Sequence, residues 1–289
     1  MNIKALSRIE PWQWPRNAAE TIRGVLLNRQ AKPSDRLIAA DLAGDYTVIS
    51  DEMDNALLKV LEDGSETDAI RVRAAISFGP VLETMYLELD DDEPPISEST
   101  LSRIHFTLEK VYQDTGNSKE LRRRVVEGSV RFPQPWHEPA IREAWESGDP
   151  EWMLTAVFAM RHVRGFEESI MAALRSSDPL IHLEAVRAAG TWGLEAAWPH
   201  VVSLVQGHDT SKDLLIEAIS AVGSIRPAEA RHVLKDLLDT GDEDVDEAAH
   251  EAIEMADATV RADSEADLDQ EDGDEEDDED EEDDKDWIN

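Results

Sequence analysis

The sequence predicts an all-α protein: an α-solenoid of about seven helical hairpins, with an N-terminal capping helix and a disordered acidic C-terminal tail. An eight-residue apolar pattern recurs roughly every 33 residues, and a second helical pattern follows most copies. The end of the chain is almost entirely acidic. We therefore expect a capping segment at 1–32, a solenoid at 33–258 and a tail at 259–289.

The capping segment contains one amphipathic stretch, Asn17–Asn28, with Ile22 and Leu26 on the same helical face. Trp12 and Trp14 precede it, beside two prolines. We expect both indoles to cover the open end of the stack that follows.

The repeated pattern, which we call the octet, occurs seven times at intervals of 35, 51, 31, 29, 33 and 34 residues. Its third and fourth positions are Ala, Val or Ile, which allow neighbouring helices to approach closely. Glycine at the eighth position of four copies indicates helix C-termini. The copies are Leu37–Gly44, Val72–Gly79, Arg123–Val130, Leu154–Arg161, Leu183–Gly190, Ile216–Gly223 and His250–Asp257.

A second helical pattern follows each octet except the last, and short turns rich in Asp, Ser, Gly and Pro separate it from the next octet. We call these the acidic turns, and their Asp and Ser side chains can cap the helices that follow. We call the turns directly after the octets the octet turns. The long interval of 51 residues is explained by an acidic insertion at Asp90–Pro95.

The octets and their spacing resemble HEAT repeats, in particular the short bacterial type also seen in phycobilin lyase-like proteins. The resemblance covers about 37–257 and implies a stacked helical architecture, but it does not specify a function. The tetratricopeptide repeat fits less well, because no unit has that repeat's combination of Trp, Tyr and Pro.

The net charge of −37 disfavours nucleic acid and anionic lipid as partners. Residues 263–289 contain 18 Asp or Glu and one Lys, so the rest of the chain still carries −20 of the total. There is no cysteine, no signal-peptide-like start and no apolar run long enough to span a membrane. We expect a cytoplasmic protein whose partner is another protein.

No catalytic pattern is recognisable, and we predict no catalytic residue, cofactor or metal. A HEAT-like family of di-iron hydroxylases uses paired His-Glu motifs, but only His250-Glu251 occupies the corresponding octet positions. A calcium loop ending at Gly273 fails because Gln270 and Leu268 stand where acidic or amide ligands are needed. No feature identifies a bilin pocket.

The octet turns in the middle of the chain are rich in Arg, His and Trp and almost free of acid. Arg and Trp are enriched in protein-binding hot spots, so these turns are the candidate partner-binding site. In the alternative interpretation, the tryptophans pack on neighbouring turns and the arginines pair with nearby Glu. The candidate residues are Arg131, Trp136, Arg161, His162, Arg164, Trp192 and Arg226. Trp145, Trp152 and Trp198 fall within or at the start of helices and are expected in the core.

The acidic tail ends in Trp287 and resembles the tails of bacterial single-strand-binding proteins, which dock on basic partners. Trp287 is therefore a candidate anchor for a basic protein surface. The tail could instead fold back on the basic turns, or simply keep the protein soluble.

The favoured function is a non-catalytic scaffold or adaptor that binds a protein through the octet turns and through the acidic tail. One alternative is a lyase-like enzyme or enzyme subunit. A second is an acidic-tail chaperone for basic proteins. The sequence leaves the oligomeric state open.

Overall fold

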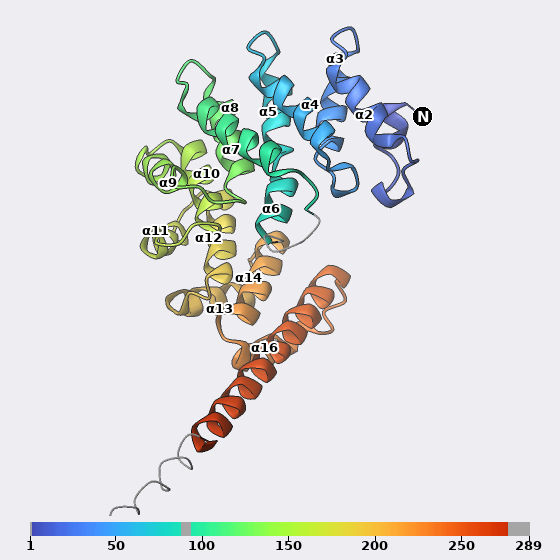
Figure 1. Cartoon of the computed structure of the whole chain (residues 1–289). Coiled ribbons are helices and arrows are strands. Elements are labelled where there is room, and N and C mark those ends of the chain that lie inside the picture. Colours follow the sequence, from blue (N-terminus) through green and yellow to red (C-terminus); the bar gives the residue numbers. More distant parts are fainter. Residues whose placement is uncertain (1, 88–93, 277–289) are drawn as a thin grey trace, which may run out of the picture. The chain divides into compact units, whose positions relative to one another are not determined.

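A computed structural model describes residues 2–87 and 94–276, without the side chains of 263 and 266–276. Within this description every regular element is a helix, so the predicted all-α class is confirmed (Figure 1). The chain forms two compact units, Met1–Phe166 and Glu167–Asn289, which are described separately below. In the described part, no helix is both long enough and apolar enough to cross a bilayer.

The first unit begins with a short capping region and continues as pairs of helices. Its elements are α1 (Ile3–Leu6), η1 (Pro11–Gln13), α2 (Ala18–Leu27), α3 (Pro33–Leu42), η2 (Tyr46–Val48), α4 (Asp51–Glu62), α5 (Asp68–Ile76), α6 (Gly79–Leu87), α7 (Glu98–Gln113), α8 (Lys119–Ser129), α9 (His137–Glu146) and α10 (Pro150–Met160).

The second unit continues the same pattern of paired helices. Its elements are α11 (Glu167–Ala173), α12 (Pro179–Thr191), η3 (Glu195–Ala197), α13 (Trp198–Gln206), α14 (Lys212–Ile225), α15 (Pro227–Leu234), η4 (Lys235–Leu237) and α16 (Glu243–Glu276).

Each octet helix packs against the helix that precedes it in the chain. The antiparallel pairs are α2–α3, α4–α5, α7–α8 and α9–α10 in the first unit, and α11–α12, α13–α14 and α15–α16 in the second. From the sequence we expected each octet helix to pair with the helix after it, and this pairing is wrong. The acidic turns are short connections within hairpins, whereas the octet turns connect one hairpin to the next.

Octet helices stack side by side within each unit. In the first unit α3 packs on α5, α5 on α8 and α8 on α10; in the second, α12 packs on α14 and α14 on α16. The third and fourth octet positions face these contacts, and Ala185, Val186, Ala218 and Ile219 are completely buried. Small and β-branched residues therefore recur because octet helices touch each other there.

Two octet glycines correct the expectation of helix ends. Gly190 and Gly223 lie in the last turns of α12 and α14, near the helix ends as expected, but still within the helices and buried. A Cβ on Gly223 would lie 2.8 Å from the backbone oxygen of Ala252 in α16, so the glycine permits close approach of two helices. The cause is contact between backbones rather than a C-terminal turn.

Acidic-turn residues cap α8, α10 and α12, as the sequence predicted, whereas the N-cap residues of α3, α5 and α14 form no side-chain capping hydrogen bond. Asp149 accepts hydrogen bonds from the backbone N–H groups of Glu151 and Trp152, and Asp178 does the same at the start of α12. Ser118 caps α8. These side chains satisfy N–H groups that have no partner within the helix.

The predictions for the two ends of the chain concerned the capping tryptophans and the start of the tail. Trp14 packs on the core, and its indole N–H donates to the Leu6 and Ile9 carbonyls, but Trp12 is 76% exposed and covers nothing. Helix α16 continues past the predicted boundary at 258. Most side chains of the predicted disordered tail, 259–289, lie outside the described residues.

Candidate functional site

The octet turns of the first unit border an open groove of about 660 Å³. Because α3, α5 and α8 stack in register, their C-terminal ends lie together, and the segment between α1 and α2 closes one side. The apolar lining residues are Ile9, Pro11, Trp14, Leu42, Tyr46, Ile76 and Pro80. This surface therefore combines three successive repeats with the capping segment.

Large apolar side chains in the groove remain accessible to solvent. Tyr46 is 60% exposed and Ile76 is 38% exposed. Grouped exposed apolar surface on a folded protein marks an interaction site more often than single exposed residues do.

Arg131 stands at the edge of this groove, in the octet turn after α8. Its Nη1 forms an ion pair with Glu83 Oε2 at 2.7 Å. Burial raises the pKa of the nearby Tyr46 hydroxyl, and the charge of Glu83 adds to this effect while Arg131 opposes it. Arg131 is thus held by an acidic neighbour, as the alternative interpretation of the sequence expected.

Arg131, Arg161 and His162 gather around one aromatic ring. The guanidinium carbons of Arg131 and Arg161 lie 6.0 and 5.9 Å from the centre of the Phe158 ring. Burial lowers the pKa of His162 to about 4, and the charges of Arg161 and Arg131 lower it further. The imidazole is therefore neutral near pH 7, and the cluster's positive charge resides on the two guanidinium groups.

Trp136 is packed on both of its faces. Its ring stacks on Tyr112 with 5.0 Å between ring centres and 27° between planes, and the His137 ring lies 3.9 Å away. This geometry favours a packing role for Trp136. Arg164 is exposed in the turn that follows α10.

The second unit contains the two remaining described candidates. Trp192 is half-buried at the end of α12, and its backbone N–H donates to Ala188 O. Arg226 forms ion pairs with Glu195 at 2.7 Å and Glu229 at 3.0 Å, and its guanidinium lies 5.1 Å from the Trp198 ring centre. Trp287 lies outside the described residues.

Over the described residues, no three or more His, Asp and Glu side chains are arranged to hold a metal ion. His250 is exposed on α16, and its Nδ1–H donates to Asp246 O at 2.7 Å.

The groove was not predicted from the sequence. Tyr46 and Pro80 follow the first two octets, and Ile76 is the fifth residue of the second octet. Beside Asp45 the first of these turns looks like an ordinary connection. The available signal was large apolar residues in turns, but only the stacking of α3, α5 and α8 brings them together.

Comparison with known proteins finds a family match within the second unit. Residues 167–254 match the family model described as HEAT repeats. The chain contains HEAT repeats. The match begins where α11 begins, in agreement with HEAT hairpins formed by a helix and the octet helix after it.

Solved structures resemble the chain at low sequence identity. A chain of the CpcE and CpcF complex of phycocyanin lyase from Nostoc is 16% identical, with 86% of this chain and 98% of that chain covered and a TM-score of 0.50. Human deoxyhypusine hydroxylase is 15% identical, with coverages of 83% and 96% and a TM-score of 0.39. No curated protein sequence matches the chain. At these identities the structural similarity concerns the fold alone.

Proposed function

We propose that this HEAT-repeat protein is a non-catalytic adaptor that binds another protein through the octet turns of its first unit. The observation that carries the proposal is the apolar groove with Tyr46 and Ile76 exposed in it. The groove's volume is of the size that accepts several side chains of a peptide segment.

The charged residues beside the groove would set the specificity of this adaptor. Arg131 borders the groove and also flanks Phe158 together with Arg161. Arg164 follows in the same turn region, and His162 adds a neutral imidazole. Further candidate contacts of the same partner are Trp192 and Arg226 in the second unit and Trp287 in the tail.

The proposal is tested with two matched surface variants. Ile76→Glu places a charge in the groove, and Phe106→Glu places one on α7 at another exposed apolar side chain, 67% accessible. A photo-crosslinker at position 46 identifies the bound protein in source cells, and its affinity is then measured with purified components. Ile76→Glu should weaken binding at least about tenfold, because a buried charge opposes apolar contact, while Phe106→Glu should not. Equal affinities for the two variants would contradict the proposal.

The tail is tested by removing residues 263–289. If the tail occludes the octet turns, its removal increases the partner's affinity; if the tail is the main binding element of a chaperone for basic proteins, removal abolishes binding. Tail-driven binding should also weaken steeply with salt, because it is electrostatic. The lyase-like alternative predicts a visible-absorbing chromophore bound to the purified protein.

A further inference from the structure

Three octet helices of the first unit carry an arginine at the same place. Arg36, Arg71 and Arg122 each precede an octet by one residue. Each donates its Nε–H to a backbone carbonyl in the last turn of the preceding helix: to Leu26 O at 2.9 Å, to Leu61 O at 2.9 Å and to Tyr112 O at 2.7 Å. The three side chains form a ladder that caps the companion helices α2, α4 and α7.

The outer nitrogens of the first two arginines are paired with the next acidic turn. Glu66 accepts bidentate hydrogen bonds from Arg36, both at 2.8 Å. Asn117 Oδ1 accepts one from Arg71 Nη1 at 3.0 Å. Glu66 and Asn117 each stand immediately before the N-cap residue of an octet helix. The ladder thus alternates an arginine with an oxygen acceptor from the following hairpin.

The third rung has no such acceptor. The residue immediately before the next N-cap, Asp149, is Gly148, which has no side chain and a φ of +68°. The Asp149 carboxylate is engaged in capping α10 and in an ion pair with Lys119 at 3.1 Å. Among the described residues, neither Nη atom of Arg122 has a hydrogen-bonded or ion-paired partner.

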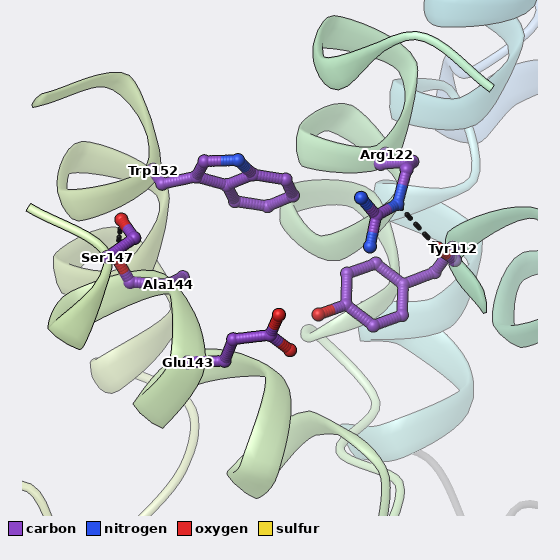
Figure 2. A pocket seen from close by; sticks show the side chains of 6 residues that line it. All are labelled: Tyr112, Arg122, Glu143, Ala144, Ser147 and Trp152. Carbon is purple, nitrogen blue, oxygen red and sulfur yellow. Dashed lines mark hydrogen bonds between the residues drawn. The ribbon is translucent and has the colours of Figure 1, made fainter. Parts of the chain in front are cut away.

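A cavity of about 60 Å³ occupies the place of the missing acceptor, and Figure 2 shows its walls. The guanidinium of Arg122 lies beside two aromatic rings, 5.1 Å from the centre of Tyr112 and 5.6 Å from that of Trp152. Trp152, expected in the core, is half-buried and lines this cavity. Glu143 points into the same space and forms no ion pair with any described residue.

We propose that this cavity binds a carboxylate that carries a neighbouring N–H or ammonium group, as found at a peptide C-terminus or in a free amino acid. The ligand carboxylate takes the place that the Glu66 carboxylate occupies at Arg36. Its two oxygens match the fork of guanidinium donors, which the aromatic rings hold in place. The Glu143 carboxylate accepts the ligand's N–H and disfavours a second negative charge.

The size of the cavity limits how much of a ligand enters. A water molecule's share of liquid volume is about 30 Å³, so the cavity accommodates a carboxylate group and little more. The remainder of a peptide would extend into solvent. This site is separate from the apolar groove and does not depend on the adaptor proposal.

The experiment uses the full chain and three small probes: glycine, N-acetylglycine and, as a control without a carboxylate, N-acetylglycinamide. Binding is followed by NMR through the indole N–H signal of Trp152, assigned with Trp152→Phe. Weak, saturable binding with a Kd of roughly 1–10 mM is expected for at least one carboxylate probe. Saturation by N-acetylglycine indicates a peptide C-terminus as the source, and saturation by glycine alone indicates a free amino acid.

Two variants at one position distinguish the ligand site from a general surface effect. Gly148→Asn places the acceptor of the second rung in the third, and Asn tolerates positive φ better than most residues. Gly148→Ala adds a Cβ at the same backbone position but no acceptor. Gly148→Asn should raise the Kd at least about tenfold relative to Gly148→Ala, because its amide oxygen pairs with Arg122. Equal Kd values, or no saturation by either carboxylate at about 50 mM, would show that the assignment is wrong.

The role of Glu143 is tested separately, through the preference between two probes. In Glu143→Gln the preference for glycine over N-acetylglycine should fall, because the amide no longer attracts an ammonium group. An unchanged preference would remove Glu143 from the proposed site. In that case the chemical class of the ligand would not be the one stated above.

Discussion

His137 makes the first unit sensitive to acid. The imidazole is completely buried at the start of α9. Its Nδ1 accepts the backbone N–H of Gln134 at 2.8 Å, and its Nε2 lies 2.8 Å from Ser129 Oγ. Since Ser129 Oγ donates its own proton to Val125 O, Nε2 must carry a proton and donate it to Ser129. A second proton, on Nδ1, would break the hydrogen bond from Gln134.

The structure gives the magnitude of this effect. Burial lowers the pKa of His137 from 6.5 to about 3. Between these values the unfolded chain binds a proton that the folded chain does not, so stability falls as the pH drops through 6.5 and the loss is complete below about pH 3. At about pH 5 the expected loss from this one group is about 2 kcal/mol relative to about pH 7.5.

The assay is urea unfolding of the first unit at these two pH values, with the wild-type chain and His137→Asn. The Asn side chain can accept the Gln134 N–H but cannot titrate, so the variant should lose about 2 kcal/mol less than wild type on acidification. Ser129→Ala is the matched control, because it removes a hydrogen bond but keeps the imidazole and therefore the pH dependence. If His137→Asn loses as much stability in acid as wild type, the reasoning is refuted.

Two further predictions concern stability. Gly223→Ala should destabilise the second unit by about 1–3 kcal/mol, because the new Cβ meets the Ala252 backbone. Gly24→Ala in α2, where a Cβ meets nothing within 4 Å, should stabilise the first unit by about 0.5–1 kcal/mol. Thermal unfolding measures both changes, and a reversed order would contradict the packing argument. Burial and the neighbouring Asp51 raise the pKa of Asp54 to about 7, so the folded state keeps a proton that the unfolded state releases. The contribution of Asp54 to the free energy of unfolding should fall by about 2–4 kcal/mol between about pH 4 and pH 8, so over this range wild type should change by that much less favourably than Asp54→Asn; equal changes in the two proteins would show that Asp54 is not the responsible group.

The candidate site was only partly predictable from the sequence. The scarcity of acid in the octet turns identified Arg131, Arg161 and His162, and the structure brings these three around Phe158. The groove beside them went unnoticed, because exposure of a turn residue depends on the neighbouring hairpin. The same reason explains Trp152, which looked like a core residue within a helix but faces a cavity.

The arginine ladder shows most clearly which part of a site cannot be predicted from the sequence. Arg36, Arg71 and Arg122 have the same position relative to their octets, and this equivalence is visible in the sequence. Whether each guanidinium has an acceptor depends on the next acidic turn, which provides Glu66, Asn117 or, at Gly148, no side chain. That turn lies about one repeat further along the chain, and only the stacking of hairpins places it against the arginine.

The sequence by itself determined the helical class, the number and spacing of the repeats, and the side-chain caps of several octet helices. These follow from local rules: the 3.6-residue period of a helix, the size of the residue at a helix contact and the hydrogen bonds at helix ends. The tertiary structure decided which helices pair across which turn, why Gly223 is required inside α14, and where a groove and an unpaired guanidinium occur. Those properties depend on the distance between backbones of neighbouring hairpins, which no local sequence pattern specifies.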